Sequence, residues 1–129
     1  MLLDNENLFC ENQDITSGTI YSQNIINFGR NDVSFAPVLV QVVADFTGLS
    51  QLKVAFETSE SADFAEPVVL AESALELANL KAGSTFPITF LPKGNKGYMR
   101  LKFVVEGNET TGKITSGVVA SNGLSIQEI

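Results

Sequence analysis

The sequence predicts an all-β fold, an antiparallel β-sandwich of the jelly-roll type with little helix. Short segments rich in β-branched and aromatic residues recur along the chain. Several of them alternate apolar and polar residues with the period of two that a half-buried strand shows. Glycine, proline and asparagine separate these segments, as turns require. The chain has 129 residues, 44% of them hydrophobic, which suits one domain with a proper core.

The first eighteen residues form the least regular part of the sequence. They show no sustained period of 2 or 3.6, although Leu2, Leu3, Leu8 and Phe9 are apolar. We therefore expect residues 1–18 to be an extended N-terminal arm rather than a strand. Such an arm either packs on its own domain or lies on a partner.

The first strands of the sandwich follow this arm. Residues 19–28 are rich in β-branched and aromatic types and end at Gly29. Residues 38–46 carry an apolar face with an outward face that includes Leu39 and Val43. Residues 52–58 repeat the alternation. Turn residues lie between these last two segments, so they are predicted to form a hairpin.

The middle of the chain contains an acidic loop and less regular strands. Residues 59–67 are polar and end at a proline, which predicts a loop. A short strand begins at Val68. Residues 73–83 suit either a helical turn closed by Gly83 or an extended segment. Residues 85–91 are predicted to be a strand, and Pro87 within them indicates a sheet edge or a bulge.

The last third contains the clearest strand. Residues 92–97 form a turn signal, and the following residues 98–106 alternate an apolar face with a mostly solvated one. The turn is predicted to join residues 85–91 and 98–106 as a hairpin. A final strand covers residues 113–120. The sandwich domain is thus assigned to residues 19–120, and residues 121–129 are assigned to a C-terminal tail.

Composition limits the partners of the protein. Fifteen acidic and eight basic residues give a net charge of −7, a sign that repels nucleic-acid phosphates and anionic membranes. The single cysteine, Cys10, excludes an internal disulfide. The first residues lack the basic and apolar regions of a signal peptide, and no apolar run approaches the roughly 20 residues of a membrane helix. We expect a soluble protein without nucleic-acid or membrane partners.

The residue types that most enzymes use are also missing. The chain has no histidine, which excludes Ser-His and Cys-His nucleophile arrangements. Gly94 and Gly97 belong to a turn signal rather than to a phosphate-binding loop between a strand and a helix. We predict a protein that is not an enzyme and that needs no cofactor.

Acidic and aromatic residues suggest an alternative class, a calcium- or carbohydrate-binding sandwich. Glu57, Glu60, Asp63 and Glu66 are candidate calcium ligands, but they do not fit the EF-hand spacing, and we interpret them as a solvated acidic loop. Sugar sites use aromatic platforms, and without tryptophan only the two tyrosines, Tyr21 and Tyr98, are available. The nine phenylalanines are interpreted mostly as core residues.

Several strings of the sequence form a pattern in their order and spacing: NIINFG (24–29), LKVAFETS (52–59), LPKG (91–94), YMRLKFVV (98–105) and TTGKITSG (110–117). In this pattern the chain resembles the small capsid cement (decoration) proteins of tailed bacteriophages. The resemblance spans nearly the whole chain and is most specific in its last third. The chain departs from the family in Asn27, where aspartate is frequent, and in a longer tail.

The resemblance implies a structural virion protein on the outer surface of the capsid, made in the host bacterial cytoplasm. Its partners would be the major capsid protein, whose capsomers it bridges, and further copies of itself as a dimer or trimer. As hypotheses, we expect partner contacts from the apolar side chains of the arm, from the outward face of residues 38–46 and from one tyrosine: Leu2, Leu3, Leu8, Phe9, Leu39, Val43 and Tyr98. The alternative remains a non-enzymatic adhesion-type module that binds calcium or carbohydrate.

Overall fold

The computed structural model describes residues 3–119 of the chain. Nearly all regular structure in this range is strand. The elements in chain order are β1 (Leu3–Asp14), β2 (Thr19–Tyr21), β3 (Ile26–Asn27), β4 (Val38–Ala44), β5 (Leu49–Ser59), β6 (Val68–Glu76), the 3-10 helix η1 (Leu77–Asn79), β7 (Tyr98–Gly107) and β8 (Lys113–Val119).

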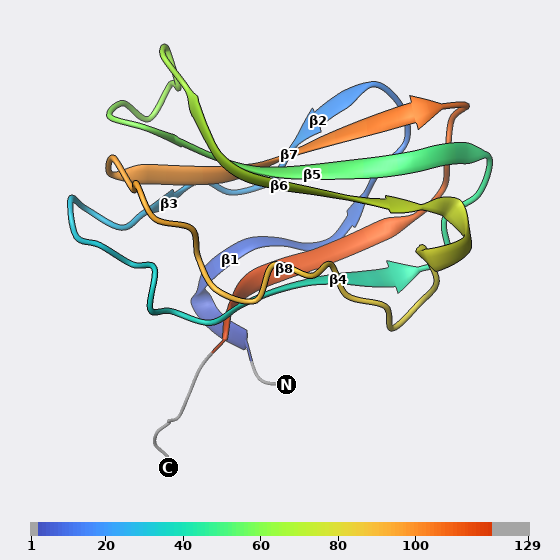
Figure 1. Cartoon of the computed structure of the whole chain (residues 1–129), viewed down its shortest axis with the longest axis horizontal. Helices are drawn as coiled ribbons and strands as arrows, with labels where there is room; N and C mark the ends of the chain where they lie inside the picture. Colours follow the sequence, from blue (N-terminus) through green and yellow to red (C-terminus); the bar gives the residue numbers. More distant parts are fainter. Residues whose placement is uncertain (1–2, 120–129) are drawn as a thin grey trace.

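The strands form two antiparallel sheets that pack face to face (Figure 1). Sheet A has the strand order β1-β8-β4. Sheet B has the order β2-β7-β5-β6, and β3 also pairs with β7. The predicted all-β sandwich with little helix is confirmed.

An irregular segment, residues 83–91, extends sheet A along the free side of β4. Isolated bridges join Gln41 to Thr85 and Pro37 to Phe90. With this segment, sheet A has four strands. Sheet B also has four if β2 and β3 are counted as one interrupted strand on β7, and two facing sheets of four strands are the arrangement of a jelly roll. Pro87 lies in this edge segment, where the missing N–H is tolerated, in agreement with the prediction of a sheet edge.

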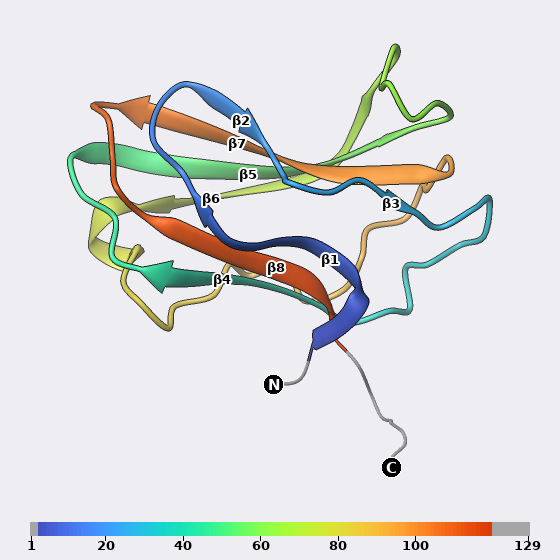
Figure 2. The same ribbon diagram turned by 180° about the vertical axis from the view of Figure 1, so that it is seen from behind.

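The prediction of an N-terminal arm is wrong for residues 3–14, because these residues form β1. The strand pairs with β8 at the edge of sheet A, as Figure 2 shows. Its register shifts between Leu3 and Leu8, between Leu8 and Cys10, and again between Cys10 and Gln13. Each shift moves the following residues to the other face, so the period of two is lost in the sequence although the strand is present.

Two predicted hairpins are also wrong, because the chain changes sheets at both places. β4 belongs to sheet A, whereas β5 lies in sheet B between β6 and β7. Residues 92–97 likewise lead from the edge of sheet A to β7 in sheet B. In a sandwich both sheets turn an apolar face inward, so alternation alone does not distinguish a hairpin from a crossing between sheets.

The segment that the sequence left open combines both alternatives. β6 stays extended through Glu76, and a single 3-10 turn follows at Leu77–Asn79. No helix within the described residues has the length and apolar character needed to cross a membrane.

The core lies between the sheets. β7 contributes Met99, Leu101, Phe103 and Val105, the alternate residues that the sequence predicted to point inward. From the opposite sheet come Phe9 of β1, the inward valines of β4 and Ile114 of β8. Phe9 and Phe56 meet edge to face, with ring centroids 5.8 Å apart. The core therefore includes the first strand.

Gly112, in the turn before β8, is packed against the ring of Phe46. A Cβ atom at this position would lie 2.1 Å from Phe46 Cδ1, and Phe46 is fully buried. We expect Gly112→Ala to lower the free energy of unfolding by about 1–3 kcal/mol, because the ring has to leave its packed position. Urea denaturation measures the loss. The double variant G112A/F46L should recover part of it, and strictly additive losses would contradict the steric explanation.

Candidate functional site

The outward faces of the two sheets differ in character. On sheet B, Lys53 of β5 and Glu106 of β7 form an ion pair of 3.8 Å. In a neighbouring row, Ala55 of β5 lies between Glu72 of β6 and Lys102 of β7 and is itself buried. This face therefore carries charged side chains of both signs, together with the exposed Val69 of β6.

Sheet A instead places apolar residues outward at one end. Paired residues in neighbouring strands share a face of the sheet. One outward row follows from the pairing of Leu3 with Val119, the hydrogen bond of 2.9 Å from Val119 N–H to the Pro37 carbonyl, and the bridge from Pro37 to Phe90. A second row contains Leu8, Gly117 and Leu39. These rows define an apolar face of six residues: Leu3, Leu8, Pro37, Leu39, Phe90 and Val119.

Gly117 allows Leu8 to lie flat on this face. A Cβ atom on Gly117 would come within 2.7 Å of Leu8 Cδ2 and 3.0 Å of the Asn7 carbonyl oxygen. The leucine therefore uses the space above the glycine, and a side chain at position 117 would displace it. The face is thus built by a close fit between β1 and β8.

An apolar groove of about 320 Å³ continues the face between β4 and residues 85–90. One wall of the groove is formed by Pro37 and by the first residues of β4, Val38, Leu39 and Val40. Phe90 stands at its rim with 56% of its surface exposed. Phe35, two residues before Pro37, is 77% exposed. Exposed aromatic side chains beside an apolar groove are typical of protein interaction surfaces.

The structure brings together three of the residues predicted to contact partners and separates the others. Leu3, Leu8 and Leu39 lie on the apolar face, whereas Leu2 lies outside the described residues. Phe9 is fully buried in the core, so its assignment as a partner contact is wrong.

The two remaining contact candidates lie elsewhere. Val43 is 37% exposed, near the opposite end of β4 from Pro37. Tyr98 is half-buried at the start of β7, in sheet B. Neither belongs to the apolar face.

The four acidic candidates for calcium binding are not gathered into one site. Glu57 pairs with Arg100 at 3.0 Å, and Glu60 pairs with Arg30 at 2.8 Å. Within residues 3–119 no group of three or more His, Cys, Asp or Glu residues is placed to hold a metal ion. Each of these two carboxylates is used in an ion pair.

Asp63 organises the acidic loop itself. Its carboxylate accepts hydrogen bonds from the Ser61 hydroxyl at 2.7 Å and from the Ala65 N–H at 3.1 Å. Both hydrogen bonds lower the pKa of Asp63, and the bond from the Ser61 hydroxyl has the larger effect. Its role is that of a turn residue that accepts hydrogen bonds from its own loop.

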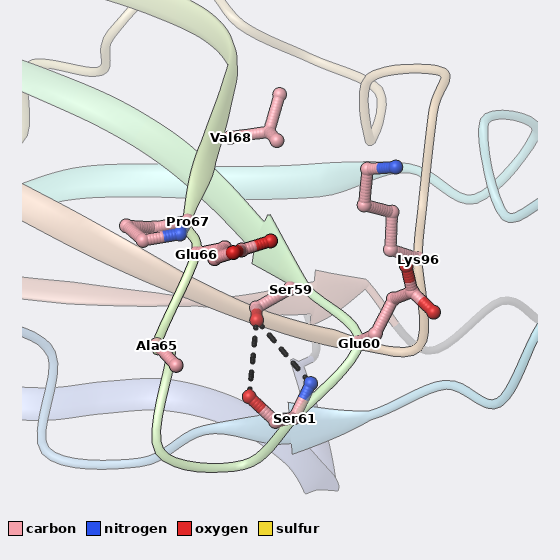
Figure 3. Close-up of a pocket in the computed structure, with 8 residues that line it drawn as sticks. All are labelled: Ser59, Glu60, Ser61, Ala65, Glu66, Pro67, Val68 and Lys96. Atoms are coloured by element: carbon pink, nitrogen blue, oxygen red, sulfur yellow. Dashed lines mark hydrogen bonds between the residues drawn. The ribbon is translucent and has the colours of Figure 1, made fainter.

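A pocket of about 430 Å³ with a mixed polar and apolar lining lies beside this loop (Figure 3). Residues 59–61 and 65–68 form one side, and Lys96 comes from the turn before β7. Ser59 Oγ accepts a hydrogen bond of 3.2 Å from the Ser61 N–H. The residues that line the pocket include two carboxylates and one ammonium group but no aromatic ring. This lining does not supply the stacking platform of a sugar site.

Arg100 holds the acidic loop against sheet B, a role that the sequence did not indicate. Its guanidinium carbon lies 3.8 Å from the centroid of the Tyr21 ring and 4.2 Å from that of Phe64. Phe64 belongs to the loop, is buried, and has a φ of 51°. The cation between two rings, together with the ion pair to Glu57, fixes the loop over the outward face of β7.

The exposed Phe35 and Phe90 were also missed, because phenylalanines were interpreted as core residues. Phe86, Ile88 and Phe90 alternate with Thr85, Pro87 and Thr89, so alternation alone would place Phe90 on the same side as buried Phe86. The bridges from Gln41 to Thr85 and from Pro37 to Phe90 differ by one residue in register, which turns Phe90 to the other face. Only the pairing with β4 shows that Phe90 is exposed.

Cys10 is expected to be chemically inert in the folded protein. It is fully buried, and its Sγ lies 3.6 Å from the Ile114 carbonyl. Burial raises the pKa of the Cys10 thiol to about 12, and a backbone hydrogen bond at Ser116 acts in the other direction. A thiol reagent at pH 8 should label Cys10 only after denaturation. Rapid labelling of the native protein would contradict the burial of β1.

Comparison with known proteins gives one family. The family model described as Bbp16 matches residues 9–118, which is most of the chain. The matched range begins within β1 and ends within β8, so it includes both sheets. No curated protein matches the sequence significantly.

Proposed function

This chain belongs to the Bbp16 family, and on that premise we propose that it is a structural virion protein that binds the outer surface of a tailed-phage capsid. In this role it bridges capsomers of the major capsid protein and stabilises the assembled head. The resemblance of its strings to capsid cement proteins supports the proposal, because these strings lie within the range that the family model matches.

The observation that carries the proposal is the unequal character of the two outward faces. Sheet B carries charged side chains among separate apolar ones such as Val69, whereas sheet A gathers its apolar residues into one face with an exposed phenylalanine at its edge. A cement protein needs a face that gains free energy when it leaves water, and a face that stays solvated on the outside of the head. Sheet A fits the first requirement and sheet B the second.

A protein present in many copies can act through contacts that are individually weak. Each copy that binds only the assembled lattice stabilises that lattice by mass action. A copy that binds two capsomers at once has a higher overall affinity than either contact gives alone, because the second contact forms within the same complex. Copies are also expected to associate with one another as dimers or trimers, and sedimentation velocity of the purified protein measures this.

The test is co-sedimentation of the purified protein with expanded, undecorated heads, and with unexpanded proheads for comparison. The native protein should bind expanded heads saturably at a fixed ratio to the major capsid protein. The absence of binding to cognate heads in either form would contradict the proposal.

A substitution on the apolar face tests which surface is used. Phe90→Glu places a charge at its most exposed aromatic residue. We expect its dissociation constant for expanded heads to rise about 30-fold, which corresponds to the roughly 2 kcal/mol of a central apolar contact. The matched control is Val69→Glu on β6, where the side chain is 47% exposed. Equal effects of the two variants would show that sheet A is not the contact face.

A further inference from the structure

We propose that the free edge of β6 binds an extended segment of a partner protein, which joins sheet B as a further strand and carries basic residues on its outward face. β6 is the last strand of sheet B (Figure 1). A bare strand edge is a template on which another chain can pair. This contact involves a sheet edge and not the apolar face of sheet A, so it is independent of the capsid proposal.

The other outer strands have their edges covered by the chain itself. The free side of β4 is hydrogen-bonded to residues 83–91. On the far side of sheet A, the Phe9 carbonyl of β1 accepts a hydrogen bond of 2.9 Å from the Asn24 N–H. The Gln13 side chain of β1 donates one of 2.9 Å to the Tyr21 carbonyl, which joins this edge to β2. β6 differs from these strands.

The hydrogen bonds across sheet B show which backbone groups of β6 face its edge. The Leu101 carbonyl of β7 accepts a hydrogen bond of 2.9 Å from the Ser22 N–H, so the backbone groups of Leu101 point away from β5. Phe56 of β5 pairs with Leu101, and its own backbone groups therefore point to the other side, toward Ala71 of β6. Ala71 and every second residue after it are thus bonded to β5.

The residues between them, Glu72 and Ala74, turn their N–H and C=O groups to the free edge. In the part of the chain that the structure describes, no hydrogen bond outside the ladder with β5 uses the backbone of either residue. The turn before β7 packs on the start of β6, where a Cβ atom on Gly94 would lie 2.8 Å from Leu70 Cδ2. The open part of the edge therefore runs from Glu72 to Glu76, the last residue of β6.

The side chains along this open edge favour a basic partner. Glu72, Ala74 and Glu76 are exposed and share the outward face of the sheet. Neither glutamate takes part in an ion pair among residues 3–119. A partner strand with two lysines or arginines four residues apart places one basic side chain opposite each glutamate, and opposite charges on paired strands attract.

A second copy of β6 lacks this complementarity. The strand contains no lysine or arginine, so it offers no opposite charge to its own glutamates. In an antiparallel pair centred on Ala74, Glu72 of one copy lies opposite Glu76 of the other, and like charges in that position are destabilising. The glutamates thus disfavour pairing between copies and favour a different, basic segment.

The inward side of an added strand meets apolar surface. Leu75 of β6 and Leu77, which follows it, are half-buried and pack against the core. Successive side chains of a strand point to opposite faces, so apolar residues that alternate with the basic ones cover these leucines. The partner segment is therefore extended, with basic residues outward and apolar residues inward.

Titration of the isotope-labelled full chain with two synthetic peptides, followed by nuclear magnetic resonance, tests the proposal. Both peptides have valines at alternate positions. One carries two lysines four residues apart between the valines, and the other carries glutamates at the same places. The lysine peptide should shift the amide resonances of Glu72 and Ala74 and slow their hydrogen exchange. The dissociation constant of the glutamate peptide should be about tenfold higher, because two opposite-charge pairs become like-charge pairs.

Variants of β6 separate the role of the backbone from that of the charges. Ala74→Pro removes an N–H that faces the free edge, a position at which an edge strand tolerates proline, so the variant should fold and bind the lysine peptide about tenfold more weakly. Ala74→Ser is the matched control, since it keeps the N–H and should bind like the native protein. In the double variant E72K/E76K the preference should reverse in favour of the glutamate peptide.

Several results would overturn the proposal. The lysine peptide could fail to bind at millimolar concentration, or it could bind the folded Ala74→Pro variant as tightly as the native chain. An unchanged preference for the lysine peptide in E72K/E76K would also contradict it. Amide resonances of Glu72 and Ala74 that shift with protein concentration alone would assign the edge to a second copy. Since no phage heads are present, each result is independent of the co-sedimentation experiment.

Discussion

Replacement of Phe9 by alanine is expected to lower the free energy of unfolding by about 3–5 kcal/mol, the usual cost of removing a buried phenylalanine from a core. Phe9 is fully buried and meets Phe56 edge to face across the sandwich. The variant leaves a cavity between β1 and sheet B. Denaturation by urea, followed by circular dichroism, measures the loss.

The neighbouring residue supplies a matched control. Leu8 lies on the outward face, half-buried above Gly117, so Leu8→Ala should cost much less than Phe9→Ala. If Phe9→Ala unfolded like the native protein, β1 would not belong to the core. Deletion of residues 3–14 should also lower the free energy of unfolding, because it removes a strand of sheet A together with the core side chain of Phe9.

Arg100→Ala is expected to have the second large effect, a loss of about 3 kcal/mol, because it leaves the Glu57 carboxylate buried without its partner. The Glu57 side chain is 5% exposed and that of Arg100 is 15% exposed. The variant also removes the cation between the rings of Tyr21 and Phe64. Thermal and urea denaturation measure the change.

Two further variants separate the causes of this loss. Lys102→Ala, on the same face of β7, should change stability only slightly, since Lys102 takes part in none of the ion pairs among residues 3–119. The double variant R100A/E57Q should recover part of the loss, because glutamine carries no buried charge. An Arg100→Ala variant as stable as Lys102→Ala would show that the ion pair contributes nothing.

The strands that could be predicted from the sequence are those with an undisturbed register. β7 keeps its alternation over its whole length, and its inward residues are buried as predicted. β1 could not be predicted because its three register shifts erase the alternation. The order of strands was equally hidden, since the apolar faces of β4 and β5 look alike although they belong to different sheets.

The candidate site was predictable only in part, for a related reason. Leu8 and Leu39 are recognisable in the sequence as apolar residues, but their place in one row on either side of Gly117 depends on the pairing of β8 with both β1 and β4. The exposure of Phe90 depends on its bridge to Pro37. Neither contact is local, so a reading of sequence patterns could indicate the residues but not the surface they form.

The pairing of the first strand with the last also constrains how the protein is made. Cys10 and Ile114, which are in contact through the thiol and a carbonyl, are 104 residues apart, and sheet A combines strands from the beginning, middle and end of the chain. β5 and β6 are neighbours in sequence and can pair as soon as both have left the ribosome. The first strand has to wait until nearly all the chain is synthesised, with Phe9 still exposed to water. Folding should therefore be slow for a domain of this size. A chaperone that binds the unfolded chain is expected to bind the exposed first strand.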